Sequence, residues 1–238
     1  MKRSRRWRPP VQAASAFAGF RFPSEVILLA VRWYLRCALS YRDLEELLAE
    51  RGITVDHVTL FRWVQRFIPE LIDAARPCRR QVGDRWFAGE TYVKVAGVWR
   101  YVYRAVDQHG QVIDVYVSQH RDIASARQFF TAALAAYRAP VEVITDRAPA
   151  LAHVIEQLIP AAFDNTGQYQ NNRCKADHGR LKARLRPMRE LTTNRTASVV
   201  IRGHANAWNL RRGHDELGVE TAPVFRPATA FDELQLAI

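Results

Sequence analysis

The spacing of hydrophobic and polar positions changes near residue 80, from a helical period to the alternation of strands. Before that point, apolar residues recur every three or four positions, which predicts helices over 24–35, 40–52 and 56–71. Each predicted helix begins at a residue type that caps helix N-termini, namely Ser24, Ser40 and Asp56. The second helix stops at Gly52, and the tight connection into the third is typical of a helix-turn-helix.

Beyond residue 84 the chain is rich in β-branched and aromatic residues. Three runs, 85–95, 98–107 and 111–118, are separated by short Gly-containing turns and predict an antiparallel meander. The segments expected to follow are a helix over 123–138 capped by Asp122, a strand over 141–145, and helices over 149–159 and 171–186. Residues 161–170 remain unassigned. This order indicates an α/β, ribonuclease H-like mixed sheet behind an all-helical helix-turn-helix domain.

The domain organisation follows from these changes in pattern. The expected units are a basic flexible arm over 1–20, a helix-turn-helix domain over 21–73, a linker over 74–83, a ribonuclease H-like domain over 84–190 and a C-terminal helical extension over 191–238. The arm carries five basic residues around Trp7, before Pro9-Pro10, and is either a solvated tail or a segment that lies on phosphates.

Composition and charge limit the classes of binding partner and the cellular compartment that the sequence favours. The 238 residues carry a formal net charge of +11, which favours a polyanionic partner; nucleic acid is the commonest, although anionic lipid surfaces also attract basic proteins. No apolar run approaches the roughly 20 residues of a membrane span, and no signal peptide is expected. The odd set Cys37, Cys78 and Cys174, without CxxC spacing, predicts reduced thiols in a cytoplasmic protein and no zinc site.

The third predicted helix carries the candidates for reading DNA. In a helix-turn-helix, the N-terminal polar residues of this helix enter the major groove. The candidates are His57, Thr59, Arg62 and Arg66, with Trp63 and its apolar neighbours packed inward. An ordinary three-helix bundle whose exposed arginines only confer solubility would produce the same pattern.

A candidate for metal chemistry follows the strand over 141–145. Cutting and rejoining a phosphodiester uses two divalent ions about 3.5–4 Å apart, held by carboxylates. Mg²⁺ prefers such oxygen ligands. Asp146 stands where a buried strand delivers its next side chain to the carboxyl edge of a sheet. It equally suits a cap for the helix that begins near Pro149, and the two roles are compatible.

Several segments in order along the chain carry a family resemblance. They include "FRFPSEVILLAVRWYL", "DRWFAGETYVKVAGVWRYVYRAVDQHGQVIDV", "TDRAPA", "NNRCKADHGRLKARLRPMR" and "GHANAWNLRRGH". Together they resemble the insertion-sequence-six family of bacterial transposases. The resemblance implies a helix-turn-helix that recognises element ends and a ribonuclease H-like domain with an Mg²⁺-dependent Asp-Asp-Glu triad. It also implies double-stranded DNA partners, namely terminal inverted repeats and target DNA, and work as a homo-oligomer or a mixed oligomer with an active relative.

Carried over by position, the triad is incomplete. The family's first Asp, in Trp-x-Val-Asp-Glu-Thr-Tyr, corresponds to Gly89, and its Glu, in Asn-Asn-x-x-Glu-x-Asp-His, corresponds to Lys175. The second Asp is present as Asp146. Glu90 should point to the opposite face of its strand, and Asp177 lies about 200° around its helix from Lys175. Neither replaces the missing acid, so metal binding and strand cleavage are expected to be impaired.

The basic flank of the helix over 171–186 is the last candidate. Lys182 matches a basic residue that contacts DNA in such transposases, and Arg180, Arg184 and Arg186 extend its surface. The alternative is a merely solvated helix side. His178 is either a group that supports the former site or a packed histidine. Three hypotheses remain: a crippled enzyme, a non-catalytic DNA-binding regulator or oligomer subunit, and a decaying product without a selected role.

Overall fold

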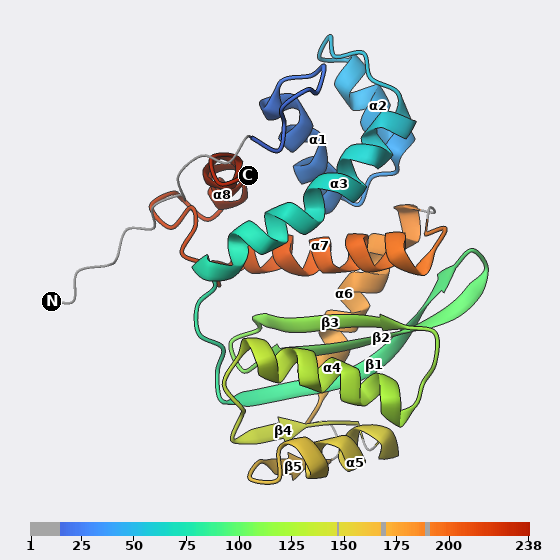
Figure 1. Cartoon of the computed structure of the whole chain (residues 1–238), viewed down its shortest axis with the longest axis vertical. Helices are drawn as coiled ribbons and strands as arrows, with labels where there is room; N and C mark the ends of the chain where they lie inside the picture. The colour runs from blue at the N-terminus through green and yellow to red at the C-terminus, as the bar shows by residue number, and fades with distance from the viewer. Residues whose placement is uncertain (1–14, 147, 168–169, 189–190) are drawn as a thin grey trace, which may run out of the picture.

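The computed structural model describes residues 15–146, 148–167, 170–188 and 191–238. Three N-terminal helices precede a sheet that is covered by helices on both faces, and further helices end the chain (Figure 1). The elements are α1 Ser24–Cys37, α2 Tyr41–Ala49, α3 His57–Ala75, β1 Arg85–Val95, β2 Val98–Asp107, β3 Val112–Ser118, α4 Ile123–Ala136, β4 Glu142–Ile144, α5 Pro149–Leu158, β5 Phe163–Asn165, α6 Asn172–Met188, α7 Asn194–Arg212 and α8 Arg226–Gln235.

The five strands form one mixed sheet in the order β3-β2-β1-β4-β5. The pairs β1–β2 and β2–β3 are antiparallel, as expected for the meander, while β4 pairs in parallel with both β1 and β5. Strand β5 lies in the segment that the sequence pattern left unassigned. The predicted α/β class with a mixed sheet is therefore confirmed.

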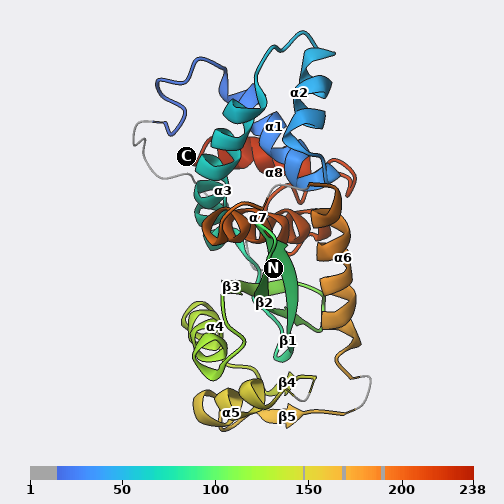
Figure 2. The ribbon, with the colours of Figure 1, turned by 90° about the vertical axis from the view of Figure 1, so that its right-hand side faces the viewer.

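Each face of the sheet packs against its own pair of helices. On β1, Trp86 and Ala88 belong to one apolar cluster with α4 and α5, whereas Phe87 and Val93 belong to another with α6 and α7. Side chains of a strand alternate between faces, so neighbouring residues join different cores. Figure 2 shows α4 and α6 on opposite sides of the sheet.

The N-terminal helices begin largely where the capping pattern places them. Ser40 accepts from the main chain of Asp43 in a capping box, and Asp56 accepts from Val58 and Thr59. Ser24 does not cap α1, because it is already the first helical residue and Pro23 precedes it without a side-chain cap. Helix α3 runs past the predicted end at residue 71 to Ala75, since buried Leu71 and Ala75 continue its apolar stripe.

The N-terminal helices share a core with the C-terminal ones. Helix α7 lies between the α1–α3 layer and the sheet in both ribbon views (Figures 1 and 2). Its buried Asn209 donates to the main-chain oxygen of Val112 and accepts from the Val112 amide, both at 2.8 Å. This side chain satisfies main-chain groups of β3, the outermost strand of the sheet, which would otherwise be unpaired.

Two segments expected to be flexible or to link domains are held by contacts. Of the basic arm, residues 1–14 lie outside the described residues, while the ring of Phe17 stacks on Phe67 with 4.7 Å between centroids. In the segment 74–83, Cys78 is buried and Arg79 donates to Asp215 at 2.6 Å and to Asn206 at 2.8 Å. These contacts hold the segment after α3 against α7 and against the loop that follows α7.

No helix in the described part of the chain is long and apolar enough to cross a lipid bilayer.

Candidate active site and basic surface

Gly89 stands in the middle of β1, on the face that α6 covers. A Cβ atom at this position would lie 3.3 Å from the Cys174 sulfur, 3.4 Å from the Asn171 amide nitrogen and 3.5 Å from the His178 ring. Asn171 also donates to the main-chain oxygen of Ala88 at 2.8 Å. Glycine in a strand interior often marks the close approach of another element. Here that element is α6, which leaves little space beside residue 89.

Asp146 reaches the same part of the sheet from the neighbouring strand. Phe87 of β1 pairs in parallel with Ile144 of β4, so Gly89 and Asp146 each follow this pair by two residues. Asp146 is exposed, and Ala148 precedes α5 as its N-cap residue without any side-chain cap. The capping alternative for Asp146 is therefore not what the structure shows.

Glu90 lies on the other face, as alternation along the strand requires. Its carboxylate pairs with Arg121, which precedes α4, at 2.5 Å. Burial is the main cause that raises the pKa of Glu90, and the negative charge of Asp146 adds to the rise while Arg121 opposes it. Glu90 thus interacts electrostatically with Asp146, but its carboxylate is turned to Arg121 beside Tyr103.

Helix α6 separates its charged residues between two sides. Lys175 is exposed, whereas Asp177 is buried and pairs with Arg104 of β2. The predicted stripe of Cys174, His178, Leu181 and Leu185 is buried. Burial lowers the pKa of His178 to about 4, and the sulfur of Cys174 lies 3.5 Å from its Nε2 atom. His178 is a packed neutral histidine in this environment.

The residues at this end of the sheet do not fit a magnesium ion. Asp146 is the exposed carboxylate, Glu90 is engaged by Arg121, and Lys175 brings a positive charge. Among the described residues, no group of three or more His, Cys, Asp or Glu side chains is arranged to hold a metal ion. A single exposed carboxylate is a poor site for a hard divalent cation, which prefers several oxygen ligands.

The predicted major-groove residues lie at the start of α3, and some have partners within the N-terminal helices. The ring nitrogen Nδ1 of His57 lies 3.0 Å from Glu45 of α2, and the hydroxyl of Thr59 donates to Asp56 at 2.6 Å. Arg66 pairs with Glu70 at 3.1 Å. Arg62 is exposed. Of the four candidates, Arg62 and Arg66 therefore present exposed guanidinium groups on this helix.

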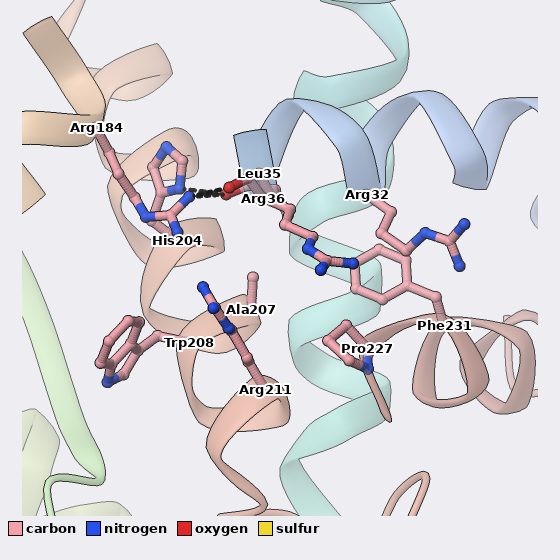
Figure 3. Close-up of a pocket in the computed structure, with 10 residues that line it drawn as sticks. All are labelled: Arg32, Leu35, Arg36, Arg184, His204, Ala207, Trp208, Arg211, Pro227 and Phe231. Carbon is pink, nitrogen blue, oxygen red and sulfur yellow. Dashed lines mark hydrogen bonds between the residues drawn. The ribbon is translucent and has the colours of Figure 1, made fainter. Parts of the chain in front are cut away.

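The four basic candidates of α6 differ in their surroundings. Lys182 places its ammonium 4.1 Å from the ring centroid of Tyr92, and the Arg180 guanidinium carbon lies 5.1 Å from that of Trp208. Arg186 is exposed. Arg184 is half-buried and donates to the main-chain oxygens of Leu35 and Arg36 at the end of α1 (Figure 3). Its position gives Arg184 a structural role that the basic pattern alone did not reveal.

Further arginines gather around Arg184. Arg32 and Arg36 of α1 and Arg211 of α7 line the same small depression, beside His204 (Figure 3). Burial lowers the pKa of Arg184, and repulsion from Arg211 and Arg36 lowers it further. These four arginines lie where α1 meets α6 and α7.

Sequence reasoning missed Arg104, Arg121 and Asn171. Arg104 lies at an alternate position of a predicted strand, on the same face as Gly89, with which it pairs across the ladder. This register could have indicated that a buried charge faces α6 and needs an acid such as Asp177. Arg121 lies just outside a predicted helix, where no periodic signal marks it. Asn171 was expected as the first residue of the helix over 171–186, but it precedes α6, and its side chain instead donates to the main chain of β1.

Comparisons with known proteins place this site in a class. A family model described as a DDE domain matches residues 83–214. Among solved structures, the chain is similar to the HTLV-2 integrase catalytic core domain in complex with magnesium (trimeric form), at 16% identity and a TM-score of 0.42, over 56% of this chain and 88% of that one. The family model alone, which spans Gly89, Asp146 and Lys175, makes this region of the chain a DDE domain.

Sequence relatives narrow the class further. The chain is 37% identical over 178 residues to the transposase for insertion sequence-like element IS431mec of Staphylococcus aureus (strain N315), covering 73% of this chain and 80% of that protein. The transposase for insertion sequence element IS257 in transposon Tn4003, also of Staphylococcus aureus, matches with the same identity and coverage. The chain belongs to the insertion-sequence-six family of transposases.

Proposed function

We propose that this chain is a transposase-family protein that binds the end DNA of a mobile element but is impaired in metal-dependent strand cleavage and transfer. The observation that carries the proposal is the residue type at three positions that match the spacing of the family's acidic motifs. Gly89 and Lys175 take the positions of the family's first Asp and its Glu, and Asp146 alone retains the acid. The fold of the domain persists around this changed set.

The size of the electrostatic change explains the expected impairment. At an effective dielectric constant of about 20, two unit charges 4 Å apart interact by about 4 kcal/mol. Replacing a carboxylate with the Lys175 ammonium turns such attraction of a divalent ion into repulsion, and Gly89 removes a second carboxylate. Lys175 is exposed and swings away to recover part of the loss. The remainder still amounts to several factors of ten in metal affinity.

Neither neighbouring acid compensates for the substitutions. Glu90 is held on the opposite face by Arg121, and Asp177 is buried against Arg104. Moving Asp177 towards the site would leave Arg104 as an unpaired buried charge, which is strongly destabilising. The chain therefore lacks the ligand set for a metal-dependent strand-transfer step.

DNA binding requires none of the missing carboxylates. The exposed Arg62 and Arg66 of α3 would read or position the duplex as part of a helix-turn-helix, with His57 and Thr59 nearest its start. On α6, Arg180, Lys182 and Arg186 form a basic surface for phosphates, and Arg184 orients that helix against α1. The net charge of +11 supports a polyanionic partner.

The partners that follow are double-stranded DNA with terminal inverted repeats and, in an assembly, target DNA. An impaired copy that binds ends also fits a regulatory role: it would occupy those ends, or join oligomers of an active relative, without cutting. A homo-oligomer that binds without cleavage belongs to the same proposal. The cytoplasm, where bacterial DNA lies, is the compartment in which we expect it to act.

Binding and cleavage are tested on one labelled duplex that carries the terminal inverted repeat flanking the coding region. We expect a gel shift of this duplex, weaker binding to a scrambled duplex and no nicked product with Mg²⁺. Arg62→Ala should reduce the discrimination between the two duplexes roughly tenfold, whereas Arg138→Ala, on the exposed turn after α4, should leave it unchanged. Magnesium-dependent cleavage by the purified chain would refute the impairment, and equal binding to both duplexes would refute end recognition.

A further inference from the structure

An exposed aromatic surface lies on the β1–β2 hairpin. Tyr92 is 52% exposed, Trp99 50% and Val98 50%, although large hydrophobic side chains in the rest of the sheet are mostly buried. We call Tyr92, Lys94, Val98, Trp99 and Lys182 the hairpin patch. Large apolar side chains that gather on one surface typically mark an interaction site.

The two rings of the hairpin patch are held in a defined arrangement. Tyr92 and Trp99 contact each other edge to face, with 4.9 Å between centroids and an interplanar angle of 88°. Lys94, which pairs with Trp99 across the ladder, places its ammonium 5.0 Å from the Trp99 ring centroid. Lys182 reaches the Tyr92 ring from α6. Each ring is therefore accompanied by a cation, and the patch carries two positive charges.

The backbone of the hairpin is fixed on both sides of the patch. Ala96 and Gly97 form its turn with φ values of 48° and 80°, as a two-residue hairpin turn requires. The Ala96 amide donates to the main-chain oxygen of Leu191 at 2.7 Å, and Arg100 donates to Asn194 at 2.7 Å. The hairpin is thus hydrogen-bonded to Leu191, which precedes α7, and to Asn194, the first residue of α7.

We infer that the hairpin patch is a stacking surface for unpaired bases of DNA. Exposed aromatic rings stack on any nucleobase, and adjacent lysines neutralise the phosphates that connect the bases. The exposed contact between Lys182 and the Tyr92 ring is weak enough to be exchanged for a phosphate, which would free the ring face for a base. Tyr92 lies three residues beyond Gly89 on β1, so its side chain leaves the strand on the opposite face. The inference rests on the proposed DNA binding and specifies a form of DNA for this surface.

Charge favours DNA over a second copy of the chain at this surface. A two-fold dimer would bring the same patch from both subunits together. Lys94 and Lys182 would then face their own copies, with no carboxylate among the five residues of the patch to pair with them. A polyanion has the opposite charge and suits the same rings.

The test compares a labelled single-stranded oligonucleotide of about 20 nucleotides with the blunt duplex of the same sequence, at one fixed salt concentration. The variant is Tyr92→Ala combined with Trp99→Ala, read by fluorescence anisotropy. We expect its affinity for the single strand to fall about ten- to a hundredfold, because each stacked base contributes strongly to such binding. Affinity for the duplex should change by less than about twofold, since paired bases are not available to stack.

Matched variants separate stacking from damage to the hairpin. Phe163→Ala removes an aromatic ring that is 67% exposed on β5, at the other edge of the sheet, and should leave both affinities unchanged. Tyr92→Phe combined with Trp99→Phe keeps both rings and should restore single-strand binding to within about threefold of wild type. Circular dichroism and thermal unfolding establish that every variant is folded.

Each other outcome overturns the inference in a recognisable way. Equal losses on both DNA forms would make the patch a general contact, and unchanged single-strand binding would make it a purely structural hairpin. Dissociation of a wild-type dimer by the Ala variant, seen by sedimentation velocity without DNA, would assign the patch to a second copy. Wild-type protein that binds neither DNA form would refute the proposed function itself, whereas duplex binding without any effect of the patch would refute this inference alone.

Discussion

The buried and exposed faces of α6 differ in what holds their residues in place. On the buried face, Cys174 packs beside Gly89, Asp177 pairs with Arg104 and Leu181 enters the core of the sheet. On the exposed face, Lys175 and Arg186 lie in solvent. A substitution on the first face disturbs packing and charge pairing, whereas one on the second changes chemistry and leaves the fold intact. This difference explains how the DDE domain accommodates a lysine at position 175 without disturbing its packing.

The largest expected effect comes from breaking the buried face. Asp177→Asn removes the partner of Arg104 and leaves a buried guanidinium without a compensating charge, which should lower the free energy of unfolding by about 3–5 kcal/mol. Lys175→Asn, on the same helix but exposed, should change it by less than about 0.5 kcal/mol. Urea unfolding of both variants measures the contrast. Similar losses for the two variants would contradict the division of α6 into two faces.

The expected loss of metal binding is tested by introducing acids at Gly89 of β1 and at Lys175 on the exposed face of α6. Gly89→Asp combined with Lys175→Glu should raise Mg²⁺ affinity by about a thousandfold or more over wild type, roughly 4 kcal/mol, because two carboxylates and the loss of an ammonium all favour the ion. Each single substitution should give only part of this gain. Isothermal titration calorimetry measures binding without any need for catalysis.

The small space beside residue 89 should limit the gain in Mg²⁺ affinity that an aspartate brings at this position. A Cβ at this position would already lie 3.3 Å from the Cys174 sulfur, so an aspartate there presses on α6. Adding Cys174→Ala to the pair should strengthen Mg²⁺ binding and recover stability. If neither the double nor the triple variant bound Mg²⁺, the assignment of Gly89 and Lys175 to the family's acidic positions would be wrong.

Elements whose residues are buried in a regular pattern could be predicted from the sequence, whereas contacts between distant segments could not. Periodicity located most of the elements because burial imposes it: strands 85–95 and 98–107 have the expected bounds, and the α6 stripe is buried as predicted. The segment 74–83 read as a linker, yet Arg79 is tied to Asp215, which lies far along the chain. Contacts of that kind depend on tertiary proximity, and no local pattern reports them.

For the candidate site, the sequence could predict the positions of the residues but not the contacts that they make. Its three positions came from matching motif spacing, and the parallel pairing of β1 with β4 places two of them side by side. The contacts around these positions were not predictable from the sequence. Arg121 donates to Glu90, and Asn171 donates to the main-chain oxygen of Ala88. Both contacts join segments that are distant along the chain, so no local pattern indicates them. Arg184 shows the limit most clearly: its basic character suggested DNA, but its guanidinium binds main-chain oxygens of α1.

A smaller effect should follow from the histidine of the buried face. Burial holds the pKa of His178 at about 4, below its ordinary value of 6.5. As the pH falls through 6.5 the unfolded chain takes up this proton first, so the stabilisation present above pH 6.5 is lost progressively towards pH 4. His178 should therefore account for about 2 kcal/mol of lost stability between pH 7 and pH 5.

Replacing this histidine isolates its share of the pH dependence. His178→Gln should reduce the loss of stability between pH 7 and pH 5 by about 2 kcal/mol, measured by urea unfolding at both pH values. Arg186→Gln, on the exposed face of the same helix, serves as the control that should leave the loss unchanged. His204, whose pKa burial lowers to about 3, contributes a separate loss in both variants. An unaltered pH dependence in His178→Gln would mean that His178 is not kept neutral by burial.

The smallest expected effect concerns the basic residues of the exposed face. Lys182→Ala and Arg186→Ala should each weaken binding of element-end and scrambled duplexes to the same extent, because a phosphate contact carries no sequence information. Each should also reduce the slope of log affinity against log salt by about 1. Binding titrations at several salt concentrations measure both quantities, with Arg138→Ala as the control for a lost surface charge elsewhere. A slope that stays at the wild-type value would mean that the exposed face of α6 is only solvated, and end recognition would then depend on α3 alone.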